Sequence, residues 1–266
     1  MTEQRTASEP TSGHARRLVA SEALKLSYTT TAWRALAVMG ALLLVIASLV
    51  ASSRASAAVH VGSGRGDAVD SVTSGLFLAQ LPAGVLGVLT VAGEFSTGAL
   101  RSSLLATPRR THLLAAKTFV ILVVVLVAAE AAAFAAFAVG GYELRNTVGE
   151  AGVGSIGVVR CVACSGLYLA AMALLGLAIG GICRSRTAGV IGLLIAVSVL
   201  PTFVNFLPPK ADAQVTRYLP TELGMDMVRL GSDHGDFGPL PGALLLGCWI
   251  FLTMTAAAAR LKSADV

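Results

Sequence analysis

The sequence predicts an all-α polytopic membrane protein with six transmembrane helices, and three observations support this. First, 55% of the 266 residues are hydrophobic and only 13% are charged, whereas a soluble domain carries about 25% charged residues. Second, six stretches are long and apolar enough to cross a bilayer, which takes about 20 residues. Third, basic residues concentrate in alternate connecting segments. Because lipid offers no hydrogen-bond partners to an open strand, the apolar stretches are expected to be helices.

The six expected spans differ in regularity. The second and fifth contain Pro82 and Pro201, and proline removes a backbone N–H, so we expect kinks there. "ASA" after the first span resembles a signal-peptide cleavage site, but a signal peptide has a shorter apolar core nearer the chain start. We therefore interpret this stretch as a retained span. The six are residues 35–51, 75–92, 118–139, 161–182, 188–207 and 240–259.

The basic residues predict the orientation of the spans. With the N-terminus inside, thirteen of the 20 Lys and Arg residues lie in inner segments and seven in outer loops, whereas nine acidic residues lie outside and five inside. Cytoplasmic loops are enriched in Lys and Arg. We therefore expect a multi-pass plasma-membrane protein with N- and C-termini cytoplasmic. The net charge of +5 is then a topology signal, and no nucleic-acid partner is expected.

The N-terminal region is polar and then amphipathic. Residues 1–13 are expected to be a disordered tail, 14–34 an amphipathic cytosolic helix and 35–266 the six-span membrane domain. Such a helix can lie along the lipid headgroups, with Trp33 as an interface anchor. The alternative is a charged tail that only sets orientation. The apolar face holds Ala15, Val19, Ala23 and Leu26, with Glu22 beside it, and Arg17, Ser21 and Lys25 line another face.

Motifs for catalysis or metal binding are weak. The phosphate-binding pattern G-x-x-x-x-G-K-[ST] does not occur in the sequence, so we do not expect ATP hydrolysis by that device. Cys161 and Cys164 form C-x-x-C without a second pair at metal-site spacing, which favours buried apolar cysteines. No histidine lies in a span, which argues against a Ser–His intramembrane hydrolase. We therefore predict that the chain is not an enzyme and holds no cofactor or metal.

One ionisable residue lies deep in a span. Glu130 is near the middle of the third span, where a charge costs about 2.5–3.5 kcal/mol on insertion scales, so its side chain should face protein or water. Gln80 and Arg160 are polar neighbours at roughly similar depth. These three residues are candidates for a translocation path or, for Glu130, a proton carrier. The alternative is a protonated side chain that hydrogen-bonds between helices, and the sequence leaves both open.

The connection between spans two and three reads as a short basic helix. Ser96 or Thr97 is a suitable N-cap, three leucines give the segment an apolar side, and the residue before Pro108 disfavours further helix. Arg109 and Arg110 are placed to meet anionic headgroups. The alternative is a basic loop that only sets topology. The leucines are Leu100, Leu104 and Leu105.

Three stretches, in order, resemble permease subunits of type 2 ATP-binding-cassette exporters, especially actinobacterial ones. "SEALKLSYTTTAWRALAV" at residues 21–38 resembles the start of these subunits, and "VAGEFSTGALRSSLLATPRRTHLLAAK" at 91–117 resembles their segment after the second span. "YLPTELGMDMV" at 218–228 resembles their outer segment before the last span. The likeness covers nearly the whole chain and keeps the six-span count.

This resemblance implies an exporter subunit driven by ATP that is bound elsewhere. Two copies of a separate ABC ATPase subunit would dock on the cytosolic segments, and a second permease copy or a paralogue would complete a dimer in the bilayer. The coupling helix between spans two and three would carry Glu94, Phe95, Gly98, Leu100, Arg101 and Leu104, and the N-terminal interface helix Glu22, Lys25, Leu26 and Trp33.

Two other functions fit the same residues. A secondary transporter would use Glu130 to carry protons, and a membrane anchor or immunity protein would transport nothing. The residues do not identify a substrate.

Overall fold

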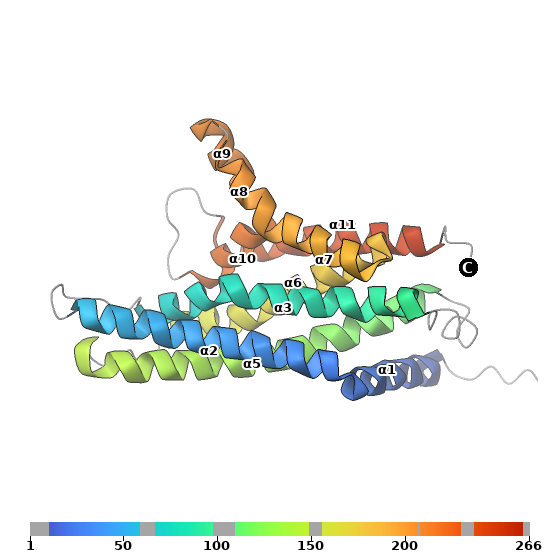
Figure 1. Cartoon of the computed structure of the whole chain (residues 1–266), viewed down its shortest axis with the longest axis horizontal. Helices are drawn as coiled ribbons and strands as arrows, with labels where there is room; N and C mark the ends of the chain where they lie inside the picture. The colour runs from blue at the N-terminus through green and yellow to red at the C-terminus, as the bar shows by residue number, and fades with distance from the viewer. Residues whose placement is uncertain are drawn as a thin grey trace, which may run out of the picture.

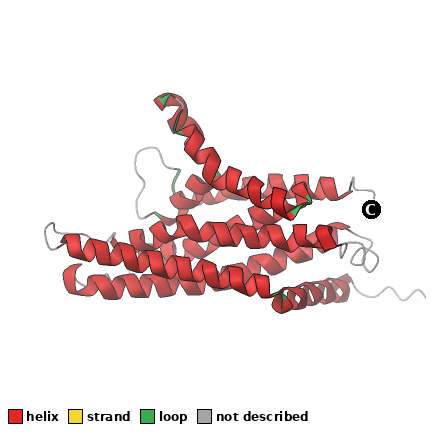
Figure 2. Cartoon of the chain, in the orientation of Figure 1, coloured by secondary structure: helices red, strands yellow, loops and turns green. Residues whose placement is uncertain are grey.

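The computed structural model describes residues 11–58, 67–97, 110–148, 156–206, 208–229 and 237–262, and every regular element in these ranges is a helix (Figure 2). The helices are α1 (Thr11–Tyr28), α2 (Thr30–Ala58), α3 (Asp67–Thr97), α5 (Arg110–Val148), α6 (Ile156–Cys183), α7 (Arg186–Leu194), the π-helical segment η1 (Ile195–Val199), α8 (Leu200–Val204), α9 (Pro209–Thr216), α10 (Pro220–Val228) and α11 (Pro239–Lys262).

Six helical stretches are long and apolar enough to cross a membrane, which confirms the all-α, six-span prediction. Five of them contain one expected span and extend a few residues beyond it, because helices continue past the apolar stretch into the interface, whereas the fifth ends at Val204, three residues before the expected end at 207. The fifth span is built from α7, η1 and α8. The stretches are Thr30–Arg54, Val72–Phe95, His112–Tyr142, Gly157–Cys183, Arg186–Val204 and Pro239–Leu261.

Helix α6 is the centre of the bundle. It contacts α3, α5, α7, α10 and α11, and 78% of its spanning stretch is buried, against 17% for α11. Helices α2, α3 and α5 run beside one another along the long axis (Figure 1), and each of the three pairs is in contact. Alanine, leucine and valine dominate the buried surface.

Helices α3 and α6 meet through glycines, with backbone against backbone. A Cβ atom added at Gly87 would lie 1.9 Å from the carbonyl oxygen of Ala173, and one at Gly176 would lie 2.0 Å from that of Gly84. Small residues allow this close approach, which gives van der Waals contact in a solvent as apolar as the side chains. We call this contact the glycine seam.

The prolines of spans two and five affect their helices differently. Pro82 lies inside α3, which continues across it. Pro201 follows the π-helical segment, at whose end the N–H of Leu200 bonds to the carbonyl of Ile195, five residues back. Because Pro201 has no N–H to give to the turn before it, the wider turn accommodates the missing bond. Beyond it, α8 and α9 rise away from the other helices (Figure 1).

The N-terminal helix differs from the expected range 14–34. Helix α1 ends at Tyr28, Thr29 is non-helical and α2 begins at Thr30. The Thr29 hydroxyl donates to the carbonyl of Lys25 at 2.7 Å and the Trp33 indole N–H donates to that of Ser27 at 2.9 Å, so side chains bridge the break. Thr11 to Gly13, in the expected tail, belong to α1, and residues 1–10 lie outside the described part of the chain.

The expected helix start at Ser96 or Thr97 is wrong. Helix α3 continues through Thr97, because the span's own helix extends beyond the hydrocarbon and carries these residues in its last turn. The coupling helix expected after it falls on residues 98–109, which lie outside the described residues.

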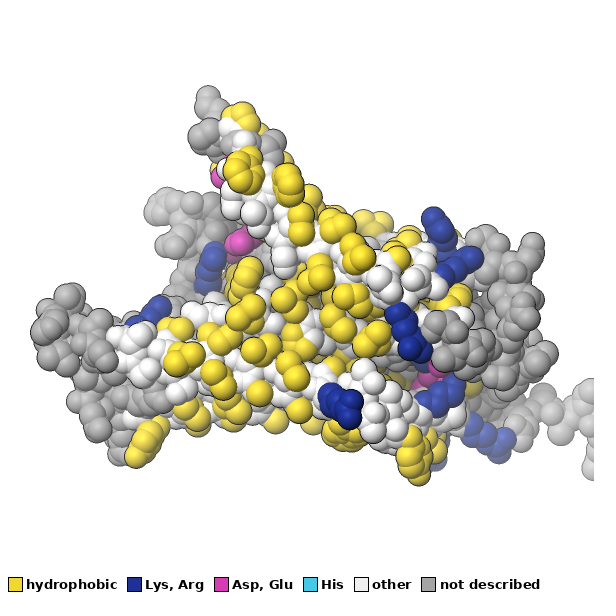
Figure 3. Space-filling model, viewed as in Figure 1, with side chains coloured by type: hydrophobic (Ala, Val, Ile, Leu, Met, Phe, Trp, Pro, Cys, Tyr) yellow, Lys and Arg dark blue, Asp and Glu magenta, His cyan; other side chains and the backbone are white. Residues whose placement is uncertain are grey.

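The inner segments expected from the basic residues lie together at one end of the bundle. Helix α1, the ends of α3 and α11, and the α6–α7 connection share that end (Figure 1). Arg184 Nη2 donates to the carbonyl of Arg260, and Arg186 Nη2 donates to that of Gly93 at 3.3 Å. Most Lys and Arg side chains in view gather there, and hydrophobic side chains cover the middle (Figure 3). That this end faces the cytoplasm stays a prediction.

Candidate functional site

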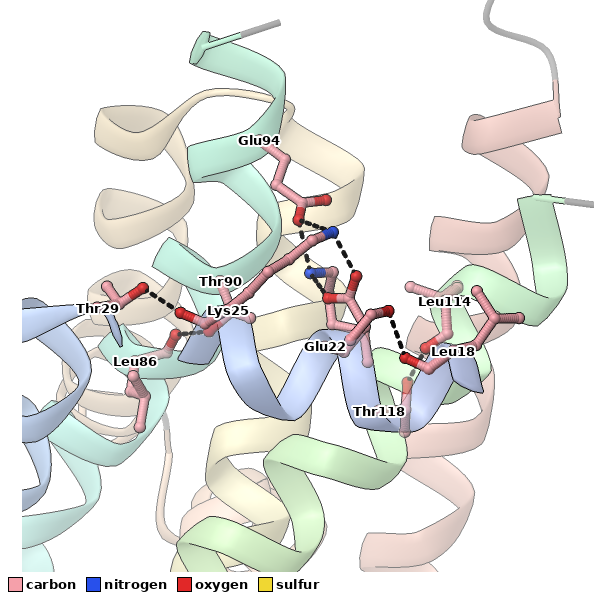
Figure 4. Close-up of polar contacts among 11 residues, drawn as sticks. Leu18, Glu22, Lys25, Thr29, Leu86, Thr90, Glu94, Leu114 and Thr118 are labelled. Atoms are coloured by element: carbon pink, nitrogen blue, oxygen red, sulfur yellow. Dashed lines mark hydrogen bonds and ion pairs between the residues drawn. The ribbon is translucent and has the colours of Figure 1, made fainter. Parts of the chain in front are cut away.

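Four charged side chains from three helices form one cluster at the α1 end (Figure 4). Lys117 of α5 is at its centre, with Nζ 2.6 Å from Glu22 Oε2 of α1 and 2.9 Å from Glu94 Oε1 of α3. Lys25 Nζ lies 2.6 Å from Glu22 Oε1 and 3.6 Å from Glu94 Oε1. We call these four residues the charge cluster. It ties α1 to both helices that flank residues 98–109.

The charge cluster is buried on one side and open on the other. The side chains of Glu22 and Lys117 are 3% and 6% exposed, that of Glu94 is 14% exposed, and Lys25 is 47% exposed. Two carboxylates and two ammonium groups balance in charge, which a buried cluster requires. Glu94 Oε2 is buried and has no hydrogen-bond partner among the described residues.

The pKa values of Glu22 and Lys25 reflect this pairing. Burial by itself would raise the pKa of Glu22, but attraction to and hydrogen bonds from Lys117 and Lys25 outweigh it and lower the pKa. Burial by itself would lower the pKa of Lys25, but its bonds to Glu22 and the charges of Glu22 and Glu94 raise it. Both residues are therefore charged at neutral pH.

Local sequence explains how the three helices meet. Leu18 and Val19 lie four and three residues before Glu22, and Leu26 lies four residues after it, so all four share the face of α1 that is turned to the bundle, with the acidic residue in its middle. Its position there requires a cation on the facing helix, and Lys117 supplies it. On the opposite side of α1, Leu24 and Tyr28 are 57% and 84% exposed.

A cavity of about 230 Å³ opens beside the charge cluster. All four cluster residues line it, together with side chains from the start of α2, from α3 and α5, and from the first residue of α7, Arg186. The lining combines charged side chains with leucine, isoleucine, valine and alanine. The apolar lining consists of Leu26, Ala32, Leu86, Leu89, Val120 and Ile121.

Most of the expected interface and coupling residues that the structure describes lie at or near this site. Glu22 and Leu26 are buried, Lys25 is half exposed, and Trp33 is 60% exposed at the α1–α2 junction. Glu94 belongs to the cluster, and Phe95 packs beside Leu113 and Leu261. The other expected coupling residues, Gly98, Leu100, Arg101 and Leu104, lie outside the described residues.

The three expected path residues have separate neighbours. Gln80 accepts from the Tyr168 hydroxyl and donates to the carbonyl of Phe77 at 2.9 Å. Arg160 donates to the carbonyl of Arg229 at 3.3 Å. The carboxyl group of Glu130 lies against Gly166, where an added Cβ atom would be 2.5 Å from its Cδ.

The outer stretch resembling the exporters folds into α10, a short helix with eight of its nine residues buried. Gly224 packs against Tyr168, since an added Cβ atom would lie 2.0 Å from the ring. Asp226 Oδ1 lies 3.7 Å from Arg229 Nη1. Helix α10 therefore packs over the same Tyr168 that bonds to Gln80.

Sequence reasoning missed Lys117 as the partner of two acids. The signal was present: Glu94 follows the expected second span, Lys117 directly precedes the third, and Glu22 lies in the segment before the first, so all three were expected on the same side of the membrane. Pairing them required knowing which helices are neighbours. Among the described residues, no three His, Cys, Asp or Glu side chains are grouped to hold a metal ion.

No protein-family model matches the chain, and no curated protein matches it significantly.

Proposed function

We propose that this chain is the membrane-spanning permease subunit of an ATP-driven exporter of the type 2 ABC class, working as a dimer in the plasma membrane. Energy would come from two copies of a separate ATPase subunit, because the sequence contains no phosphate-binding loop. The observation that carries the proposal is the charge cluster, which joins α1, α3 and α5 at the end where the basic segments gather.

The cluster suits a coupling role because of what it connects. Residues 98–109 join α3 to α5, and Lys117 bonds to Glu22 and Glu94 on either side. A protein that moves residues 98–109 therefore pulls on two spans and on α1 together. The ion pairs hold α1 to both spans at neutral pH, since separating them would leave buried charges without partners. In this proposal, nucleotide-driven closure of the ATPase pair moves this unit and changes the exposure of a path at the dimer interface.

The test is co-purification from the native membrane. The tagged chain should retain a protein that carries a phosphate-binding loop and hydrolyses ATP, at one copy per permease chain. Leu100→Asp and Arg101→Glu should reduce that association while the chain still inserts and expresses. Arg109→Gln with Arg110→Gln is the matched control, which removes charge from the same segment but should spare docking. Full association and full transport in the Leu100 and Arg101 variants would contradict the proposal.

Orientation has its own test. In a background without the four native cysteines, single cysteines at Ser63 and Ser232 should react with an impermeant reagent in intact cells. A cysteine at Ser103 should react only after lysis. Labelling of Ser103 in intact cells would overturn the orientation and, with it, docking on residues 98–109.

A second candidate is a proton-coupled secondary transporter, favoured by Glu130. Its Oε2 atom is buried in the third span without a hydrogen-bond partner among the described residues, and intramembrane carboxyl groups often relay protons. Dissipating the proton gradient while ATP is held constant separates the two candidates. Transport that stops under this treatment identifies the secondary transporter, and transport that continues supports the ATP-driven one.

A further inference from the structure

We propose that the cavity beside the charge cluster binds the phosphodiester headgroup of an anionic phospholipid. This inference concerns a resident lipid and does not depend on the proposed function. It rests on the lining of the cavity, its charge and its place in the bundle.

The lining is amphipathic. The charged part of the lining consists of Glu22, Lys25, Glu94, Lys117 and Arg186, and leucine, isoleucine and valine side chains of α1, α3 and α5 supply most of the apolar part. On α3 and α5 the apolar residues lie farther from residues 98–109 than Glu94 and Lys117 do, so we take the cavity to have a charged end and an apolar end. A small polar solute would leave the apolar end without a partner, and a hydrocarbon would leave the charged end without one. A molecule with a charged head and an attached apolar chain satisfies both ends.

The charge selects the headgroup. Three cationic and two anionic side chains line the cavity, so one positive charge is left over. A phosphodiester carries one negative charge, which balances it. A zwitterionic headgroup also carries an amine, and its positive charge would again leave the cavity with one excess positive charge. Arg186 is the residue best placed to bind. Within the described part of the chain its guanidinium makes one hydrogen bond, a long one of 3.3 Å to the carbonyl of Gly93, and a guanidinium has five N–H donors suited to phosphate.

The cavity can be reached from outside and lies at headgroup depth. Thr29, Thr31 and Arg186, all on its lining, are exposed. Trp33 and Tyr28 are exposed at the adjacent α1–α2 junction, at 60% and 84%, and exposed aromatics mark the membrane–water interface. A volume of about 230 Å³ is below the roughly 300–1,000 Å³ of typical ligand pockets. It fits a headgroup and the first part of a chain, with the remaining chain in the bilayer.

The experiment is native mass spectrometry of the full chain, purified in mild detergent and titrated with dimyristoyl phosphatidylglycerol, dimyristoyl phosphatidylcholine or inorganic phosphate. We expect one phosphatidylglycerol per chain to bind saturably and more tightly than phosphatidylcholine. Arg186→Gln should weaken that binding about tenfold, since a charge-assisted hydrogen bond is lost. Arg34→Gln is the matched control: Arg34 is exposed on α2 but absent from the cavity lining, so its loss should change nothing.

A second variant keeps the test decisive if Arg186→Gln does not fold. Thr31→Trp places a bulky ring at an exposed part of the lining without changing charge, and it should exclude the lipid. Equal binding of phosphatidylcholine and phosphatidylglycerol would overturn the charge argument. Binding of inorganic phosphate in place of lipid would overturn the lipid assignment. Unchanged lipid binding in both the Arg186 and Thr31 variants would overturn the site.

Discussion

The glycine seam and the charge cluster hold helices together by opposite means. In the seam, α3 and α6 touch backbone to backbone, and an added Cβ atom at Gly87 would lie 1.9 Å from a carbonyl oxygen. In the charge cluster, α1 is held to α3 and α5 through long side chains, with Lys117 Nζ between two carboxylates. The two backbones in the seam are too close together for either helix to shift towards the other. The cluster can open once its ion pairs are broken, as by a change of pH, because only side chains bridge the helices there.

The difference divides the molecule into a fixed part and a releasable part. Helix α6, with 78% of its span buried, anchors the fixed part. Helix α1 contributes few buried apolar side chains, Leu26 among them, and depends on ion pairs. Close packing is insensitive to pH, whereas ion pairs are sensitive to it. Four predictions test this division, from the largest expected effect to the smallest.

The largest effect is expected from Gly87→Leu. Its side chain would collide with the backbone of α6, which cannot move aside as a flexible side chain can. Overpacking typically costs about 1–3 kcal/mol, and the loss here should exceed it and abolish a folded peak in size-exclusion chromatography. The control is Gly247→Leu, at an exposed position where an added Cβ atom meets nothing within 4 Å. A folded Gly87 variant would show that the seam is not fixed.

The next largest effect is expected from Lys117→Met. It leaves the buried carboxylates of Glu22 and Glu94 without their central cation, and breaking a buried pair in this way costs about 3–5 kcal/mol. The thermal midpoint of unfolding should fall. A cysteine that replaces Leu26, whose side chain is buried between α1 and the bundle, should become reactive towards thiol reagents. Adding Glu22→Gln and Glu94→Gln to Lys117→Met removes the uncompensated charges and should recover much of the loss. A triple variant no better than the single one would show that Lys117 acts through packing alone.

Acidification should release α1 without opening the seam. Docking lowers the pKa of Glu22 below its ordinary 4.5, so undocked α1 takes up a proton more readily and docking weakens as pH falls below about 4.5. Lys25 has a raised pKa, so its contribution persists to its ordinary 10.5 and is lost above that. Docking is therefore strongest between these values.

The measurement uses 4,4′-dithiodipyridine, which reacts with thiols in acid. The rate at a cysteine replacing Leu26 should rise as pH falls, relative to a cysteine at exposed Leu24, which corrects for thiol chemistry. A constant ratio of the two rates down to pH 3 would contradict control by the ion pairs.

Glu130→Leu should have the smallest effect, and in the opposite direction. Glu130 Oε2 is buried without a partner in the described structure, and an unsatisfied buried polar group costs about 1–3 kcal/mol. Its removal should leave the thermal midpoint unchanged or slightly raised, whereas Glu22→Leu should lower it. A clear fall in the Glu130 variant would assign that carboxyl group to holding helices together.

The spans could be predicted from sequence because hydrophobic length alone determines them. The charge cluster could only be predicted in part. The sequence singled out Glu22, Lys25 and Glu94 as interface or coupling residues, but not Lys117. A charge is visible in a sequence, whereas its partner depends on which helices are neighbours.

The ends of the helices were also predicted wrongly from the sequence. Ser96 reads as a cap because serine caps helices often, yet α3 continues through it. The stability of a helix that extends from a membrane span overrides this local preference. The glycine seam was missed too, since glycines that pack and glycines that turn look alike in a sequence.

The connection between α6 and α7 has a consequence for biosynthesis. Only Arg184 and Ser185 separate the two helices, and Arg184 has a φ of 53°, in the left-handed region that reverses the chain sharply. Two residues cannot be translocated independently of the helices that they join. We therefore expect spans four and five to enter the bilayer as one helical hairpin during synthesis, because the two arginines at its tip, Arg184 and Arg186, resist transfer across the hydrocarbon. The turn would thus set the direction of two spans in a single insertion event.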